Sequence, residues 1–279
     1  MLVAAATILV GFIVLVWSAD LFVAGAASIA ENMGISHIII GLTIVSLGTS
    51  APEVLVSITA ALSDAGELAI GNAIGSNIAN IGMVLGVTVL VAPLCVHQNC
   101  MRQEMPTLLV VTVGCGLLML DGELARLDGI LMLAALALIL IQMIRSQSRD
   151  ESLIEATEEE ELPHLRPLRA WITFIIGLAL LIASSRLLVW GAAQVAHELG
   201  VSQLIIGLTI VAVGTSLPEL AATVASALRG HTEIAIGNVI GSNLFNLLAV
   251  MPIPGLFKPQ LLDSWVLSRD YTAMAGATF

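Results

Sequence analysis

Apolar residues run through this chain in long stretches that are separated by short polar breaks. A helix needs about 20 mostly apolar residues to cross the hydrocarbon core of a bilayer, and stretches of this kind recur from end to end. The pattern therefore predicts an all-α, polytopic membrane protein. Eight helical segments are expected, near residues 2–30, 36–62, 68–94, 105–121, 127–145, 169–196, 203–228 and 233–256.

One long polar stretch, residues 146–168, follows the fifth segment and contains an acidic run from Asp150 to Glu161. We interpret it as a solvated cytoplasmic linker between two halves, residues 1–145 and 169–279, with a calcium-sensing loop as the alternative. The apolar N-terminus has no basic flank and no clear cleavage site, so it is predicted to be the first membrane helix and not a signal peptide.

Composition and charge agree with a membrane location. The chain is 58% hydrophobic and 11% charged, whereas soluble domains carry about a quarter charged residues. The net charge of -11 and the absence of a basic stripe argue against nucleic acid as a partner. The lipid bilayer of the cytoplasmic (inner) membrane is the expected surrounding. Arginines concentrate in alternate loops, which favours an external N-terminus; the loops expected inside hold Arg102, Arg145, Arg149, Arg166, Arg169 and Arg229.

The strongest signal is an internal repeat. A first copy starts at Gly34 and a second at Gly200, a shift of 166 residues, and roughly half of the aligned positions are identical. A repeat imposed by lipid alone would keep hydrophobicity and scramble the polar positions. Here the polar positions are the ones kept, in the motifs GTSAPE and GTSLPE and in the motifs GNAIGSN and GNVIGSN.

The number of crossings sets the geometry of the repeat. Five spans separate the second segment from the seventh, so the two copies enter the membrane from opposite faces. This predicts an inverted-topology repeat with a binding site at the midplane, as in many secondary transporters. Asp20 and Arg186 occupy matching positions, but inversion directs them to opposite faces, so no salt bridge between them is expected.

The first motif places an acid inside an apolar helix. Pro52 has no N–H, and its ring clashes with the carbonyl one turn back, so a bend is expected at GTSAPE. Glu53 would cost about 2.5–3.5 kcal/mol at a helix centre if left alone, and Glu219 repeats that cost in the second copy. Carboxylates, carbonyls, hydroxyls and amides are hard oxygen ligands that suit calcium and sodium and not zinc or copper.

The second motif carries glycines four residues apart, Gly71 with Gly75 and Gly237 with Gly241. This spacing puts both glycines on one helix face and permits close packing. The asparagines and serines near that face would then offer oxygens across the contact. Packing alone is the alternative interpretation.

The charges of the two buried carboxylates indicate a mechanism of ion exchange. Two carboxylates balance one divalent cation, and several sodium ions could occupy the same oxygens in its place. An empty, doubly charged site should reorient slowly through a low-dielectric interior, which would make exchange obligatory.

With GTSxPE and GNxIGSN each present twice, the sequence resembles the cation/calcium exchanger superfamily, and most closely its bacterial sodium/calcium exchanger branch. The resemblance covers nearly the whole chain. It implies two inverted five-helix halves and the exchange of sodium for calcium at one shared site, with no enzyme activity and no cofactor. Members of this superfamily have two more helices after the eighth. In this chain the residues after the eighth segment are too few and too polar to span a membrane, so the chain is expected to lack the last two helices.

The resemblance also implies roles for individual residues. Glu53 and Glu219 would be the calcium carboxylates, completed by the backbone carbonyls of Thr49 and Thr215. The predicted sodium ligands are Ser50, Ser76, Ser216 and Ser242, and Asn80 and Asn246 would line the centre. Family members that carry potassium tend to have an aspartate where Asn246 stands, and calcium/proton exchangers typically carry a glutamate in the second motif, so the residues present favour sodium.

Rival interpretations stay open at this point. They are a calcium/proton antiporter of the same fold, a cation channel, a membrane enzyme with Ser50 or Ser216 as nucleophile, and a truncated, inactive exchanger. No histidine or lysine stands at a repeated site position to act as the base that an enzyme would need.

Overall fold

The structure is a computed structural model that describes residues 2–94, 103–147, 165–202, 210 and 212–279. Its regular structure is almost entirely helical, which confirms the all-α class. The exception within the described residues is a pair of two-residue strands, β1 (Glu123–Leu124) and β2 (Gln260–Leu261), which run antiparallel and join two loops.

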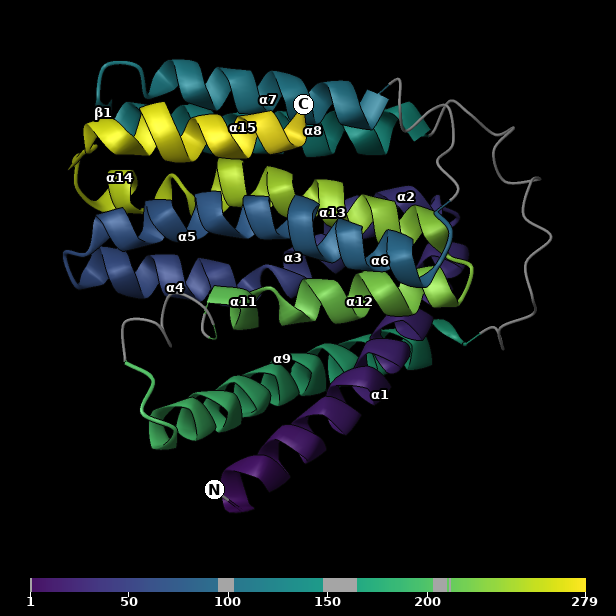
Figure 1. The fold of residues 1–279 in the computed structure, drawn as a ribbon. Helices are drawn as coiled ribbons and strands as arrows, with labels where there is room; N and C mark the ends of the chain where they lie inside the picture. The colour runs from purple at the N-terminus through teal and green to yellow at the C-terminus, as the bar shows by residue number, and fades with distance from the viewer. Residues whose placement is uncertain (1, 95–102, 148–164, 203–209, 211) are drawn as a thin grey trace.

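The helices pack together as a bundle (Figure 1). Several are joined by π-helical turns, which carry one extra residue per turn and often occur at functional sites. The α-helices are α1 (Leu2–Met33), α2 (His37–Ile40), α3 (Ser46–Thr49), α4 (Ala51–Leu62), α5 (Gly66–Ala79), α6 (Gly86–Val91), α7 (Met105–Leu118), α8 (Arg126–Gln147), α9 (Pro167–Glu198), α11 (Ala212–Thr215), α12 (Leu217–Leu228), α13 (Thr232–Phe245), α14 (Ile253–Phe257) and α15 (Thr272–Thr278); the π-helical turns are η1 (Gly41–Val45), η2 (Asn80–Leu85), η6 (Asn246–Val250) and η7 (Val266–Tyr271).

The apolar segments of the sequence are mostly helical where the structure describes them. Five helices are long and apolar enough to cross a membrane, or six when the bent pair His37–Thr49 and Ala51–Leu62 is taken as one span. The fourth segment forms the shorter helix α7, and the described end of the seventh forms α11 and α12. Residues 203–209 of the seventh segment and the acidic run 150–161 lie outside the described residues.

The two copies of the repeat fold alike. Helices α4 and α5 match α12 and α13 residue for residue at the shift of 166, and the π-helical turns η2 and η6 begin at the matching Asn80 and Asn246. Figure 1 shows the turn after α4 at one end of the bundle and the turn after α12 at the opposite end. The copies therefore run in opposite directions, as the odd number of intervening spans predicts.

Helix α13 is the centre of the bundle. The span Thr232–Phe257 is almost wholly buried, and side chains of α13 belong to the larger hydrophobic core with parts of α5, α7 and α8. Its glycines let α2 and η1 approach closely: a Cβ built on Gly237 would lie 2.5 Å from the Ile38 carbonyl oxygen, and one on Gly241 would lie 2.5 Å from that of Leu42. This confirms the predicted close packing for the second copy. The stretch that would face Gly71 and Gly75 by the repeat lies mostly outside the described residues.

Helices α1 and α9 cross on one side of this bundle (Figure 1). They are in contact through stacked rings of Phe22 and Phe174, with centroids 4.7 Å apart. Gly25 and Gly177 lie at the same crossing, where a Cβ would come within 2.6 Å and 2.5 Å of the opposite backbone. The N-terminal segment is thus an integral helix of the fold.

The residues after the eighth segment are largely helical. They form η7 and α15 as one helical stretch, although it is not among the helices long enough to cross a membrane. The Tyr271 hydroxyl donates to the Thr112 carbonyl oxygen of α7, and Asn77 of α5 donates to the Met274 sulfur. The tail therefore packs against the bundle, which its polar composition did not predict.

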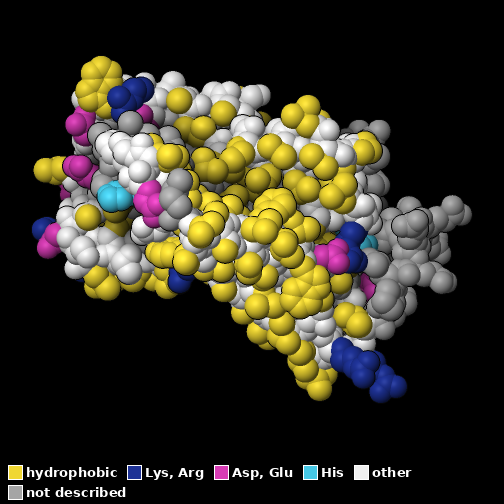
Figure 2. Space-filling view, turned by 60° about the horizontal axis from the view of Figure 1, so that its bottom comes forward, with side chains coloured by type: hydrophobic (Ala, Val, Ile, Leu, Met, Phe, Trp, Pro, Cys, Tyr) yellow, Lys and Arg dark blue, Asp and Glu magenta, His cyan; other side chains and the backbone are white. Residues whose placement is uncertain are grey.

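The surface of the molecule separates apolar from charged side chains. Figure 2 shows hydrophobic side chains spread over the middle of the face that carries α1 and α9, while charged side chains gather toward its two ends. Large exposed residues such as Ile13, Trp17 and Ile175 belong to these two helices. An apolar band between two charged ends fits a bilayer, and the chain is a multi-pass membrane protein.

Gly241→Ala tests the central packing. The new methyl group would meet the Leu42 carbonyl oxygen and the Ser46 hydroxyl at 2.5 Å, and overpacking of this kind costs about 1–3 kcal/mol. Thermal unfolding in detergent should show a lower midpoint than for the unmodified protein. Gly276→Ala in α15 is the control, because no described atom lies within 4 Å of its Cβ position; equal midpoints for the two variants would contradict this packing.

Candidate cation site

The two predicted acids begin matching helices. Each helix follows a break at a serine, Ser50 (φ −81°, ψ 3°) before α4 and Ser216 (φ −90°, ψ 5°) before α12, with a proline among the first residues. In the first copy the two helical pieces differ in direction by 45°, so the bend predicted from GTSAPE is confirmed. Glu53 and Glu219 lie in the first turns, where the positive end of a helix dipole favours a carboxylate.

Both carboxylates are buried at the interface between the two repeats. Glu53 is 1% exposed and Glu219 is 2% exposed, and they are near enough for electrostatic interaction. The Ser50 hydroxyl of the first copy donates to Glu219 Oε1 of the second at 3.3 Å. Within the described residues, both oxygens of Glu53 and Oε2 of Glu219 have no hydrogen-bond donor.

Other buried oxygens near the repeat interface also lack donors in the part of the chain that the structure describes. They are Oγ of Ser216 and Oδ1 of Asn77, Asn80 and Asn246. Buried polar atoms are normally hydrogen-bonded, and leaving one without a partner is costly. A set of hard oxygens without donors, together with two carboxylates, is the environment that binds calcium or sodium.

A hydrogen-bond network holds the second acid in place. The Thr49 hydroxyl donates to Asn238 Oδ1 at 3.2 Å and lies 3.4 Å from the Ser242 hydroxyl. Asn238 Nδ2 in turn donates to the Thr223 hydroxyl at 2.9 Å and to the Glu219 carbonyl oxygen at 3.4 Å. One asparagine of α13 thus connects α3 of the first copy to α12 of the second.

The two copies also meet through a matched pair of asparagines. Asn77 Nδ2 donates to the carbonyl oxygen of Asn243 at 3.3 Å, and these residues occupy equivalent positions. Asn80 Nδ2 donates to Asn243 Oδ1 at 3.4 Å. The equivalent helices therefore cross at the repeat axis, where inverted symmetry requires like residues to face one another.

The structure brings most predicted site residues into one buried region. Thr49, Ser50, Ser216, Ser242, Asn80 and Asn246 are each at most 1% exposed, and Ser76 is 6% exposed. Thr215 is half-buried and lines a pocket beside the site. Which atoms hold calcium and which hold sodium stays a prediction.

Asn238 and Asn243 were not predicted as site residues, and Asn77 was predicted only to offer an oxygen near the glycine face of the second motif. Each of these asparagines belongs to a polar position kept in both copies, but the sequence does not show which helices bring them to the site.

No group of three or more His, Cys, Asp or Glu side chains that could hold a metal is found among the described residues. The cage uses two acids and neutral oxygens, a donor set for hard cations.

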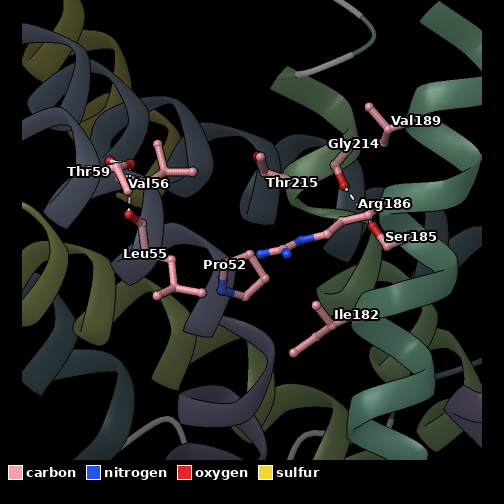
Figure 3. A pocket seen from close by; sticks show the side chains of 10 residues that line it. All are labelled: Pro52, Leu55, Val56, Thr59, Ile182, Ser185, Arg186, Val189, Gly214 and Thr215. Atoms are coloured by element: carbon pink, nitrogen blue, oxygen red, sulfur yellow. Dashed lines mark hydrogen bonds between the residues drawn. The ribbon is translucent and has the colours of Figure 1, made fainter. Parts of the chain in front are cut away.

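A pocket of about 320 Å³ opens beside the cage (Figure 3). It is lined by parts of three helices that meet at the first motif and its second copy. The lining residues are Pro52, Leu55, Val56 and Thr59 from α4, Ile182, Ser185, Arg186 and Val189 from α9, and Gly214 and Thr215 from α11.

Inverted repeats around a buried cage of oxygens define a secondary transporter of cations. Comparison with known proteins gives the family: the chain belongs to the sodium/calcium exchanger protein family, whose pattern matches residues 3–145 and 169–279. The members of this family are cation/calcium antiporters and not enzymes.

Individual relatives are similar over nearly the whole chain. CaxA of Alkalimonas amylolytica is 46% identical, covering 100% of this chain and 88% of that protein. The inner membrane protein YrbG of Escherichia coli is 42% identical, covering 98% of this chain and 86% of that protein. Among solved structures, the sodium-calcium exchanger NCX_Mj superposes with a TM-score of 0.84 at 30% identity, covering 98% of this chain and 88% of that chain.

Asn238→Ala tests the network around Glu219. The change leaves the buried Thr49 and Thr223 hydroxyls without this partner, and a buried polar group that loses its partner costs about 1–3 kcal/mol. We expect a lower thermal midpoint and weaker calcium binding by isothermal titration. The matched control is Asn72→Ala, at the equivalent position in the first copy, where Nδ2 has no partner among the described residues. Equal losses in the two variants would show that Asn238 does not organise the site.

Proposed function

We propose that the protein exchanges sodium for calcium across the cytoplasmic membrane by alternating access, with Glu53 and Glu219 as the shared carboxylates. The observation that carries the proposal is the buried pair of acids, which in the described part of the chain has one serine hydroxyl as hydrogen-bond donor and several neutral oxygens around it. Two carboxylates balance the charge of one calcium ion, and the same oxygens suit sodium ions in its place.

The residues around the acids favour sodium over protons as the coupling ion. In the second motif of both copies, the residues GSN stand where calcium/proton exchangers typically carry a glutamate, so the acid of those exchangers is missing from this motif. Asn246 is neutral and buried at the centre, which supports transport that does not require potassium. The solved relative NCX_Mj is titled a sodium-calcium exchanger, and that name supports the same assignment here.

The ligands are proposed by position. The carboxylates of Glu53 and Glu219 would bind calcium with the backbone carbonyls of Thr49 and Thr215. Ser50, Ser76, Ser216 and Ser242 would contribute oxygens to sodium, and Asn80 and Asn246 would line the space between the copies. An unloaded site keeps two negative charges in a low-dielectric interior, which opposes reorientation; either ion removes that barrier.

Glu53→Gln and Glu219→Gln test the proposal in proteoliposomes. Calcium uptake is driven by an outward sodium gradient, with a protonophore present so that no proton gradient contributes. Each variant removes one of two charges that a divalent ion needs, so uptake should fall by at least about 100-fold if the loss is near 3 kcal/mol, the scale for breaking one buried charge pair.

The matched control is Glu67→Gln, an exposed acid in the first turn of α5, and it should keep full uptake. Sodium-driven uptake that survives in both buried variants would remove these acids from the mechanism. Uptake that needs a proton gradient, and ignores sodium, would replace sodium coupling with proton coupling.

A further inference from the structure

Arg186 is a charged residue far from either end of a membrane-spanning helix. At 1.5 Å per residue it lies about 28 Å from the start of α9 and about 18 Å from its end. A charged side chain at such depth is rare and faces a partner or a water-filled cavity. The Arg186 side chain is exposed, and within the described residues no carboxylate pairs with it.

The side chain of Arg186 points into the pocket beside the cation cage. Figure 3 shows its guanidinium reaching from α9 toward Pro52, with Thr215 close by. Pro52 precedes Glu53, and Thr215 is one of the proposed ligands, so this pocket borders the cage directly. The neighbouring Ser185 hydroxyl donates to the Gly214 carbonyl oxygen at 3.1 Å, which fixes α9 against α11 and directs Arg186 into the pocket.

The repeat shows that this charge is not a general feature of both approaches to the site. The equivalent position in the first copy holds Asp20, which has the opposite sign. Asp20 forms an ion pair with Arg229 at the end of α12, near the opposite end of the bundle from the turn after α4 (Figure 1). Inverted symmetry thus gives the two sides of the membrane different electrostatics at one matched position.

We propose that Arg186 is an electrostatic filter in a water-filled approach to the cation site. Its positive charge lowers the local concentration of cations in the pocket, and it acts more strongly on divalent than on monovalent ions. It therefore sets the ion concentration at which the exchanger loads from that side of the membrane. This inference rests on the proposed sodium/calcium exchange and adds a residue that determines its sidedness and ion preference.

The size of the effect follows from the charge of the ion. At a distance of about 10 Å through water, one unit charge changes the local concentration of a monovalent cation about two-fold and that of a divalent cation about four-fold. Removing the charge should therefore lower the half-saturating calcium concentration about four-fold on the pocket side. The maximal rate should change little, since Arg186 is not one of the proposed ligands.

The test places different charges at this one position. Cys95, Cys100 and Cys115 are first replaced by alanine, and Arg186→Cys is then modified with a membrane-impermeant methanethiosulfonate reagent carrying either a positive or a negative group. Modification, read by mass, should occur from one side of the membrane only, because the pocket opens to water there. The half-saturating calcium concentration should be near that of the parent protein with the positive group and about 16-fold lower with the negative group, a change of two unit charges. The half-saturating sodium concentration should shift less for each bound ion, because sodium carries one charge.

Two control variants separate charge from structure. Arg186→Lys keeps the charge and should behave as the parent protein. Leu187→Cys places the cysteine one residue further along α9 and outside the pocket lining. After treatment with either reagent, its half-saturating calcium concentration should not depend on the charge of the reagent.

Three results would overturn the proposal: no modification of Arg186→Cys from either side, a shift independent of the sign of the attached group, or equal shifts for calcium loading from both sides of the membrane. The last result would mean that Arg186 acts on the cage itself. Failure of sodium/calcium exchange is seen separately, as absent uptake by the cysteine-free parent with Arg186 in place.

Discussion

Two carboxylates buried at the interface between two repeats of a membrane protein are the constraint around which this structure is built. Glu53 and Glu219 are almost fully buried, and most of their oxygens have no donor in the described part of the chain. Helix N-termini and the Ser50 hydroxyl offset part of the cost of burying them. Two like charges in a low-dielectric interior nevertheless repel strongly, so this pair of acids costs folding free energy unless bound cations or protons balance its charge.

The inverted repeat is how one short sequence pattern produces such a site. Each copy supplies a helix that breaks at a serine and continues with a proline and a glutamate in the first turn of the next helix, and opposite orientation brings the two breaks together near the bundle centre. The asparagines Asn77 and Asn243 meet where the copies cross, and the glycines of α13 let η1 approach closely enough for Thr49 to reach Asn238. The two copies differ at the matched positions Asp20 and Arg186, which carry opposite charges.

Much of this could be predicted from the sequence because its signals are local or repeated. The helical segments follow from hydrophobic length, the bend from Pro52, and the pairing of Glu53 with Glu219 from the repeat and the number of crossings. Contacts between distant segments could not be predicted in the same way. The pairing of Asp20 with Arg229 joins residues 209 positions apart, and the C-terminal helical stretch packs on α5 and α7 through Tyr271 and Met274. The role of Asn238 was missed for the same reason, since its partners lie on two other helices.

The measurement that tests the account most directly is the release of radioactive calcium from loaded proteoliposomes into media of different composition. If an empty pair of carboxylates opposes reorientation, release into a medium without sodium or calcium should be close to the leak of protein-free vesicles. Adding either ion outside should then accelerate release strongly. Release into the ion-free medium as fast as into the sodium medium would contradict the account, because it would show that the site crosses the membrane with its two charges unbalanced.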